Sequence, residues 1–219
     1  MSSEGPVRDG DGPDYELIET LRWEPLSGFL RLKRHLARLE RSALVLGFPL
    51  DEALVRNKLD EIAKGDQALR VRLTLDPDGV VDVTTRAFTL LAQDTIWRIA
   101  IARTRLDRND PLIHHKTTRR QVYDTARAEF SPAEVDEVVL LNDEGKVCEG
   151  TITSIFVDRG GASCVTPALR CGLLPGVLRE ELIDNGVTSE AELTVDDLRQ
   201  AKNILVGNSL RGLIRAQLL

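Results

Sequence analysis

The stretch DPLIHHKTTRRQVYDTARAE, residues 110–129, places a lysine in a chain that otherwise prefers arginine. Six of the 29 basic residues are lysines, and Lys116 follows two histidines and precedes two arginines. An amine can lose its proton and attack a carbonyl carbon, whereas a guanidinium stays charged. The stretch therefore predicts a nucleophilic lysine at position 116, and the elements on either side of it predict the fold.

The bulk composition is typical of a globular protein. The chain has 219 residues, of which 42% are hydrophobic and 29% are charged. A net charge of −6 argues against nucleic acid as a partner, although local arginines can still bind a small anionic ligand. Three cysteines without CxxC spacing indicate free thiols in a reducing cytoplasm. No apolar run reaches the roughly 18 residues of a membrane span, and the three histidines lack metal-site spacing, so neither membrane nor metal is expected.

The residues before the lysine predict a small α/β domain over residues 15–102. Residues 1–14 are expected to form a flexible leader. In 29–48 the leucines recur every three or four residues, which is typical of an amphipathic helix, and Asp51 can cap a second helix that ends near Lys64. Strands are expected at 15–23, at 69–75 and 80–88 around the turn PDG, and at 95–102. The charged, proline-terminated stretch 103–111 is the expected interdomain linker.

The residues after the linker predict a larger domain over residues 112–219, which makes the fold class α+β. Lys116 is expected at the start of a helical stretch, 116–130. A hairpin is expected from 136–142 and 146–158, and further strands at 163–167, 203–207 and 213–219. Pro175 and Gly186 bound one predicted helix, and Thr194 can cap a shorter one over 195–201.

Three features have both a structural and a functional interpretation. Glu149 is the one charge in 147–157, so it either lies at an exposed strand end or meets a buried cation such as a protonated pyridine nitrogen. The glycines and proline of RCGLLPGVLRE, residues 170–180, form either an ordinary loop or an anion site at a helix start. Arg38 recurs with three other arginines at helical spacing, which is typical of a solvated helix face.

Taken together, the ordered motifs resemble one family. HKTTRR (115–120), EGTITSIFV (149–157), CGLLPGVLRE (171–180) and GNSLRGL (207–213) are similar to the class IV, or fold-type IV, aminotransferases, which use pyridoxal 5'-phosphate. The strand YELIETLRW and the helical H-x-x-R-L at 35–39 match the family's N-terminal half. These motifs are most similar to those of the aminodeoxychorismate lyase domain that is fused to aminodeoxychorismate synthase. The resemblance extends from Tyr15 to Leu219.

The resemblance implies roles for particular residues. Lys116 would bind the cofactor covalently and move protons, and Glu149 would hold the pyridine nitrogen. Residues implied at the phosphate and ring are Arg38, the backbone amides of Val177 and Leu178, Asn208 and Ser154. Residues implied at the substrate are Thr20, Trp23, Arg211 and Tyr123. Two departures from the family's pattern stand out: many members have asparagine at Ser154, and several have tyrosine at Gln121.

Three functions are compatible with this resemblance. The first is a lyase that converts 4-amino-4-deoxychorismate to 4-aminobenzoate and pyruvate for folate synthesis. The second is an aminotransferase acting on a branched-chain or D-amino acid, and the third is a homologue that binds the cofactor but has lost catalysis. The resemblance also implies a small-molecule substrate, a homodimer, a small α/β N-terminal domain and a larger C-terminal pseudo-barrel.

Overall fold

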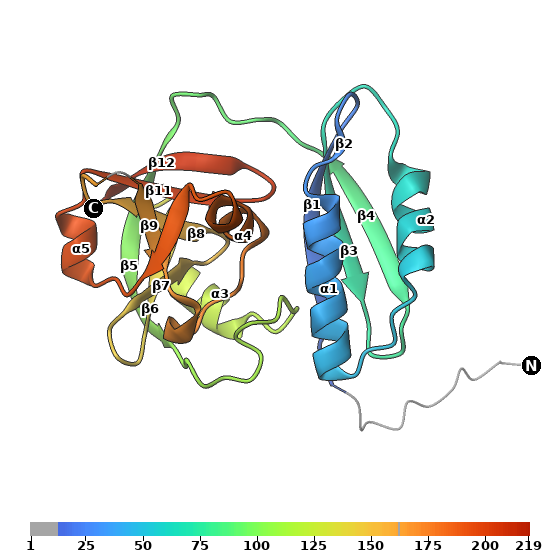
Figure 1. The fold of residues 1–219 in the computed structure, drawn as a ribbon, viewed down its shortest axis with the longest axis horizontal. Helices are drawn as coiled ribbons and strands as arrows, with labels where there is room; N and C mark the ends of the chain where they lie inside the picture. Colours follow the sequence, from blue (N-terminus) through green and yellow to red (C-terminus); the bar gives the residue numbers. More distant parts are fainter. Residues whose placement is uncertain (1–12, 162) are drawn as a thin grey trace, which may run out of the picture.

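The structure is a computed structural model that describes residues 13–161 and 163–219. The leader expected over residues 1–14 lies almost wholly outside the described residues. The rest of the chain forms two sheets, one of four strands and one of eight, and each is accompanied by short helices (Figure 1). The α+β expectation is confirmed.

The four-stranded antiparallel sheet is built from β1 (Leu17–Glu24), β2 (Gly28–Phe29), β3 (Leu69–Leu75) and β4 (Val81–Ala87), in the order β2-β1-β3-β4. The helices α1 (Leu32–Leu46) and α2 (Glu52–Ile62) belong to the same half, and Asp51 caps α2 by accepting from the Leu54 amide. Alternate side chains of β1 and β3 pack with both helices in one hydrophobic core. The other face of this sheet, which carries Thr20 and Arg72, is thereby left to form a wall of the cavity.

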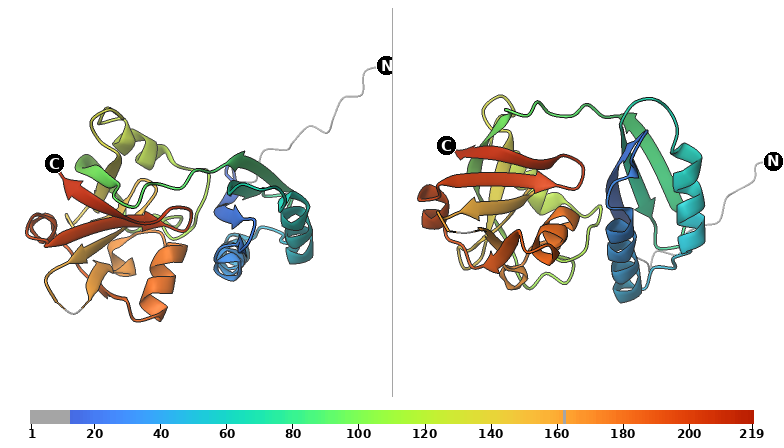
Figure 2. Two further views of the ribbon diagram at one scale, coloured as in Figure 1. Left: turned by 90° about the horizontal axis from the view of Figure 1, so that it is seen from above. Right: turned by 45° about the horizontal axis from the view of Figure 1, so that its top comes forward.

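The eight-stranded mixed sheet has the order β10-β9-β8-β11-β12-β5-β6-β7. Its strands are β5 (Ile96–Leu106), β6 (Glu137–Asn142), β7 (Val147–Gly150), β8 (Ser154–Asp158), β9 (Cys164–Pro167), β10 (Thr188–Ala191), β11 (Asn203–Asn208) and β12 (Gly212–Leu218). Its helices are α3 (Gln121–Arg127), α4 (Val177–Asp184) and α5 (Val195–Arg199), with a 3₁₀ turn at Leu169–Cys171. The sheet is curled (Figure 2). Strand β7, at one end of the order, contacts β8 and β9, which lie near the other end.

Residues 103–111, the expected interdomain linker, do not connect the two sheets. Strand β5 runs through Leu106 and pairs with β6 and β12, so residues 95–102 belong mostly to the second sheet and not to the N-terminal half. Arg103 and Arg105 are exposed because they alternate with the inward-facing Ala102 and Leu106. The charges that indicated a linker are thus the outer face of a strand, and the connection between the sheets is 88–95, the long loop at the top of Figure 1.

Lys116 does not begin a helix. The helix that follows it starts only at Gln121, and the segment before it lies against β1. The Ile18 amide donates to the Lys116 carbonyl at 2.9 Å, and the Thr118 amide donates to the Glu16 carbonyl at 2.9 Å. These contacts with a strand about a hundred residues earlier hold the lysine in an extended segment, where local helix propensity predicted a turn of helix.

The single strand expected over 146–158 is two strands, β7 and β8. The chain turns between them around the buried carboxylate of Glu137. That carboxylate accepts from the backbone amides of Thr151 and Ile152 and from the hydroxyls of Thr151 and Thr153, at 2.6 to 3.1 Å. The turn exists because a distant side chain satisfies its polar groups.

Candidate active site

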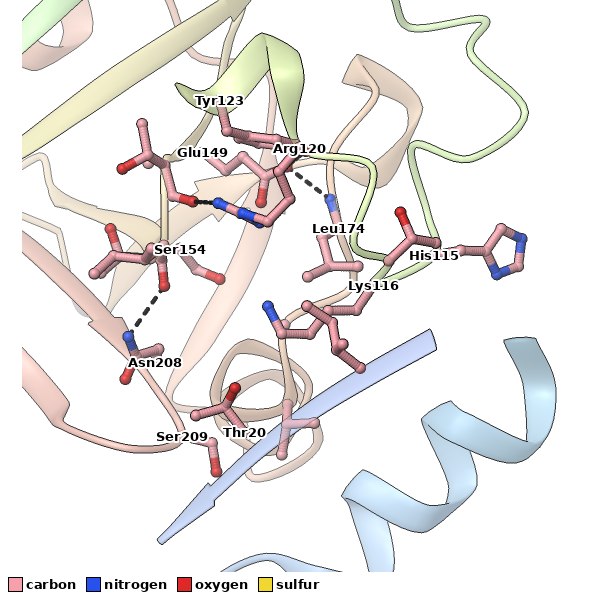
Figure 3. A pocket seen from close by; sticks show the side chains of 18 of the residues that line it. Thr20, His115, Lys116, Arg120, Tyr123, Glu149, Ser154, Leu174, Asn208 and Ser209 are labelled. Carbon is pink, nitrogen blue, oxygen red and sulfur yellow. Dashed lines mark hydrogen bonds between the residues drawn. The ribbon is translucent and has the colours of Figure 1, made fainter. Parts of the chain in front are cut away.

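A cavity of about 510 Å³ lies where the two halves of the chain meet, and both halves contribute to its walls. Thr20, Arg70 and Arg72 line it from the four-stranded sheet, and His35 and Arg38 line it from α1. The C-terminal half contributes the Lys116 segment, Glu149, the start of α4 and the turn at 208–211 (Figure 3). A site of this kind can act on a small molecule enclosed between the two halves.

Lys116 projects its amine into this cavity (Figure 3). Burial lowers the pKa of the amine to about 7, and the positive charges of Arg38 and Arg120 contribute to the same shift. A large fraction of the amine is therefore uncharged at neutral pH, which is the form that attacks a carbonyl. The prediction that position 116 needs lysine rather than arginine has this physical basis.

Glu149 lies on the cavity side of β7 and is buried, so the interpretation of an exposed strand end is wrong. One of its oxygens, Oε1, accepts from the Tyr123 hydroxyl at 2.8 Å and from the Leu174 amide at 3.1 Å. Within residues 13–161 and 163–219 no hydrogen bond reaches Oε2. Burial raises the pKa of this carboxyl to about 7. A cationic group at Oε2 would stabilise the carboxylate form.

The interpretation of Arg38 as part of a solvated helix face is also wrong. Its side chain is buried and ion-paired with Glu19, with Nε 2.8 Å from Oε1 and Nη2 2.6 Å from Oε2. Nη1 donates to the Pro175 carbonyl at 3.1 Å. A guanidinium has five N–H donors, so three bonds leave two donors available for an anion.

The three neighbouring arginines, Arg31 at the N-cap of α1 and Arg34 and Arg41 within it, each pair with an acid of α4, although Arg41 is also exposed. Arg31 pairs with Glu181 at 2.6 Å, Arg34 with Asp184 at 2.6 Å, and Arg41 with Glu180 at 2.9 Å. The arginine spacing in the sequence therefore marks the contact between α1 and α4.

The start of α4 forms part of the cavity wall, beside Arg38. The helix begins at Val177 with Gly176 as its N-cap, so Pro175 precedes the helix instead of occupying its first position. The first backbone amides of a helix have no carbonyl partner within it, so Val177 and Leu178 present N–H groups. A β-carbon on Gly176 would lie 2.5 Å from the Ser154 hydroxyl oxygen, so any larger residue at this position would have to displace that hydroxyl or the start of α4.

Asn208 ends β11, Arg211 lies in the turn before β12, and both line the cavity. The Asn208 side-chain amide donates to the Ile152 carbonyl at 3.0 Å, and its oxygen accepts from the Arg211 amide at 2.9 Å. The Asn208 side chain therefore holds the turn against the segment 151–153.

Three of the four residues implied at the substrate line the cavity, and one does not. Thr20, Tyr123 and Arg211 are in its lining, whereas Trp23 is buried in the core of the N-terminal half. Side chains alternate along a strand, so Thr20 and Trp23, three residues apart on β1, point to opposite faces. The expectation for Trp23 is wrong for this reason.

Sequence reasoning missed a buried network beside Arg38. His35 Nδ1 lies 2.6 Å from Glu19 Oε2, and His35 Nε2 lies 2.7 Å from the Ser209 hydroxyl, so α1 is tied to the turn after β11. Two signals were available. Glu19 is a lone acid on the inward-facing side of β1, and His35 lies three residues before Arg38 on the same helix face.

Comparison with known proteins assigns this site to a family. The family "Amino-transferase class IV" matches residues 16–219. The chain belongs to the class IV aminotransferases. Members of this family depend on pyridoxal 5'-phosphate, so the chain is a pyridoxal-phosphate-dependent enzyme. Its curled mixed sheet matches solved structures of fold-type IV aminotransferases.

Individual relatives include both lyases and aminotransferases. A "Putative aminodeoxychorismate lyase" of Schizosaccharomyces pombe is 31% identical over 196 residues, which are 86% of this chain and 84% of the relative. A crystal structure of a "Putative amino-acid aminotransferase" from Mesorhizobium loti has a TM-score of 0.92 at 49% identity and covers 94% of this chain and 100% of its own. The 4-amino-4-deoxychorismate lyase from Pseudomonas aeruginosa has a TM-score of 0.79 at 27% identity, covering 100% of this chain and 88% of that one.

The residues that this class IV aminotransferase places around its cavity fit the cofactor. Lys116 supplies an amine with a lowered pKa, and Glu149 presents an oxygen without a partner among the described residues. Arg38 keeps two donors beside the free amides that begin α4. None of the helices in the described part of the chain combines the length and apolar character needed to cross a bilayer.

Proposed function

We propose that the protein is a 4-amino-4-deoxychorismate lyase, forming 4-aminobenzoate and pyruvate. The observation that carries this choice is the cavity wall formed by the four-stranded sheet. Besides the aliphatic Ile18 it offers Thr20, Arg70 and Arg72, and the two arginines suit an acidic substrate better than a branched-chain amino acid. The similarity to the Schizosaccharomyces pombe relative over most of its length supports the same choice.

The proposal assigns the cofactor to the groups that line the inner end of the cavity. Arg38 and the amides of Val177 and Leu178 would hold the phosphate by charge-assisted hydrogen bonds, with Asn208 and Ser154 shaping that end. Glu149 Oε2 would hold the pyridine nitrogen in its protonated form. Bound pyridoxal phosphate supplies an electron sink conjugated to the substrate's amino group.

Lys116 would carry the cofactor between turnovers and move the substrate's proton. In the reaction the C4–H bond of the substrate breaks and its proton passes to the Lys116 amine. The electron pair completes the aromatic ring while the C3–O bond breaks, and the departing enolpyruvate takes up a proton to become pyruvate. No oxidant and no amino acceptor are consumed. The lowered pKa of Lys116 suits this role, because an uncharged amine can accept the proton at neutral pH.

A second candidate is an aminotransferase acting on a small amino acid, which the 49% identity to the Mesorhizobium loti protein favours. The hypothesis of an inactive homologue is set aside, since the chain belongs to a family of enzymes and keeps a lysine in its cavity. A homodimer in the cytoplasm is part of the proposal through the family resemblance, and sedimentation would test the dimer.

Turnover without an amino acceptor separates the two enzymatic candidates. Supplied with 4-amino-4-deoxychorismate alone, the wild-type protein is expected to release 4-aminobenzoate and pyruvate in equal amounts over many turnovers, while Lys116→Ala releases neither. Turnover only when an amino donor and a keto acid are both present would replace the lyase with the aminotransferase.

A further inference from the structure

We propose that Arg120 binds the phenolic oxygen of pyridoxal 5'-phosphate and is thus a further charged anchor of the cofactor, besides Arg38 and Glu149. The inference rests on the proposed function for the placement of the cofactor, with its reactive carbon at Lys116 and its nitrogen at Glu149. It does not depend on whether the reaction is that of a lyase or of an aminotransferase.

Arg120 lines the cavity just before the start of α3. Its Nη2 donates to the Thr151 carbonyl, and its guanidinium carbon lies 4.6 Å from the centre of the Tyr123 ring. The Tyr123 hydroxyl in turn donates to Glu149 at 2.8 Å. Figure 3 shows Arg120 beside Glu149 and Tyr123, at the end of the cavity away from Ser209. The carbonyl and the aromatic ring therefore hold the guanidinium next to Glu149.

The guanidinium keeps donors that no described residue uses. Of its five N–H groups, one is bonded to Thr151. Within the described part of the chain Nε and Nη1 have no hydrogen-bond partner, and neither nitrogen is fully enclosed by protein. The neighbouring Arg119 differs, because it pairs with Asp110 at 2.9 Å, whereas no described ion pair includes Arg120. An acceptor oxygen of a ligand can therefore bind to Arg120.

The covalent structure of pyridoxal phosphate decides which of its groups meets this arginine. The carbon that bonds an amine and the pyridine nitrogen lie at opposite corners of the ring, which matches Lys116 and Glu149. The phosphate arm leaves one edge of the ring, and the phenolic oxygen leaves the other. With the phosphate arm held by Arg38 and the start of α4, the phenolic oxygen is the acceptor that still needs a cation. Arg120 supplies that cation.

The charge of Arg120 acts on both reactive groups. Burial and the charge of Arg38 lower the pKa of the Lys116 amine, and the charge of Arg120 lowers it further. Arg120 also lowers the pKa of the Glu149 carboxyl, against the larger effect of burial. A cation that acts at both corners of the ring is close enough to stabilise the ionised form of an oxygen on the edge between them.

Cofactor affinity tests this contact without catalysis. Cofactor-free protein is titrated with pyridoxal 5'-phosphate and with 3-deoxypyridoxal 5'-phosphate, which lacks the phenolic oxygen, and binding is followed by fluorescence. We expect Arg120→Gln to weaken binding of pyridoxal phosphate about tenfold or more, because a charge-assisted hydrogen bond is lost, and to weaken binding of the analogue less than about threefold. Arg119→Gln is the matched control. Its charge is already paired with Asp110 at a partly exposed position, so either affinity should change less than about twofold.

The absorption of the bound cofactor gives a second readout. The visible band changes when the nitrogen that links Lys116 to the cofactor loses its proton. A cation at the phenolic oxygen disfavours that proton, so the midpoint of this titration should rise by about one pH unit or more in Arg120→Gln. Arg120→Lys keeps the charge and should raise the midpoint less.

The analogue separates a contact with the cofactor from support of the cavity wall. Equal weakening of pyridoxal phosphate and of the analogue in Arg120→Gln would show that Arg120 shapes the wall, and the inference would be overturned. An unchanged midpoint in that variant would overturn it as well. Should Arg120→Gln fail to fold, Arg120→Lys decides: without the planar guanidinium it should prefer pyridoxal phosphate to the analogue less strongly than wild type, and an unchanged preference would contradict the contact. Failure to turn over 4-amino-4-deoxychorismate would instead overturn the lyase and leave this inference standing.

Discussion

At the scale of single residues, the cavity shifts a base and an acid toward their neutral forms. Burial lowers the pKa of the Lys116 amine and raises that of the Glu149 carboxyl, each to about 7. The two shifts have the same origin, since burial disfavours whichever form is charged. Tyr123 opposes the shift at Glu149, because its hydroxyl donates to the carboxylate and so stabilises the ionised form.

Removing the Tyr123 hydroxyl should raise the pKa of Glu149 further. Hydrogen bonds from Tyr123 and Leu174 lower this pKa against the effect of burial, and Tyr123→Phe leaves only the second bond. We therefore expect the titration midpoint of Glu149 to move above about 7, so that less carboxylate is present at neutral pH. Carbon-13 NMR of labelled glutamate in the cofactor-free protein, between about pH 5 and pH 9, measures the midpoint.

Gln121→Ala is the matched control for this prediction. Gln121 also lines the cavity and lies on the same helix, but it makes no hydrogen bond to Glu149 within the described residues. Its replacement should leave the midpoint in place. A midpoint that is the same in Tyr123→Phe and wild type would show that the hydroxyl does not set the ionisation of Glu149.

At the scale of elements, the start of α4 lies close to a side chain of β8. Gly176 lies against Ser154 of β8, and this approach brings the free amides of the first helical turn to the cavity wall beside Arg38.

A β-carbon at position 176 should displace the start of α4. In Gly176→Ala this atom would lie 2.5 Å from the Ser154 hydroxyl oxygen, and such overpacking typically destabilises a protein by about 1 to 3 kcal/mol. We expect weaker binding of pyridoxal phosphate together with a lower free energy of unfolding. Equilibrium dialysis and urea denaturation measure the two quantities.

The double variant Gly176→Ala, Ser154→Ala tests whether the Ser154 hydroxyl causes the loss of cofactor binding and stability in Gly176→Ala. Without the hydroxyl, the closest Ser154 atom would be its β-carbon at 3.9 Å, an ordinary contact, so most of the loss should be recovered. Gly161→Ala, where a β-carbon would meet open space, controls for the substitution itself. If the double variant binds the cofactor as poorly as Gly176→Ala, steric contact with Ser154 is not the cause.

At the scale of the whole molecule, α1 joins the two halves around the cavity. Arg34, Arg41 and the N-cap residue Arg31 pair with three acids of α4. Arg38 and His35 reach Pro175 and Ser209 of the C-terminal half. Figure 2 shows α1 along the side of the N-terminal half that faces the barrel-like half. The contacts that close the cavity are therefore largely polar.

Reversing one charge between the halves should affect cofactor binding more than stability. Arg34 and Asp184 form a partly exposed pair, for which about 0 to 1 kcal/mol of stability is typical. Arg34→Glu places like charges together at this contact, so we expect a small loss of stability and weaker binding of pyridoxal phosphate, which needs both halves. Adding Asp184→Arg should restore binding. Fluorescence titration of the cofactor measures the affinity.

Arg56→Glu gives the comparison within one half. Arg56 pairs with Glu52 on α2, away from the cavity, so its reversal should change stability by a similar small amount and leave cofactor affinity unchanged. Equal effects of Arg34→Glu and Arg56→Glu on affinity would mean that the contact between α1 and α4 does not help to hold the cavity closed.

The sequence by itself determined the features that depend on residues a few positions apart. The leucine spacing of α1, the Asp51 cap of α2, the turn between β3 and β4 and the Thr194 cap of α5 all follow from local periodicity and capping. Lys116 and Glu149 also stood out, because a lysine among arginines and a single charge in an apolar stretch are unusual on the printed sequence alone.

Only the tertiary structure decided the features that depend on partners far apart in the chain. The segment that carries Lys116 is extended because β1 bonds to it, and 146–158 is divided because Glu137 binds its middle. Arg38 is buried because Glu19 neutralises it, and β5 belongs to the second sheet because β6 and β12 flank it. Local propensity differs by less than about 1 kcal/mol between most residues, so satisfying buried polar groups and pairing strands outweighs it wherever the two disagree.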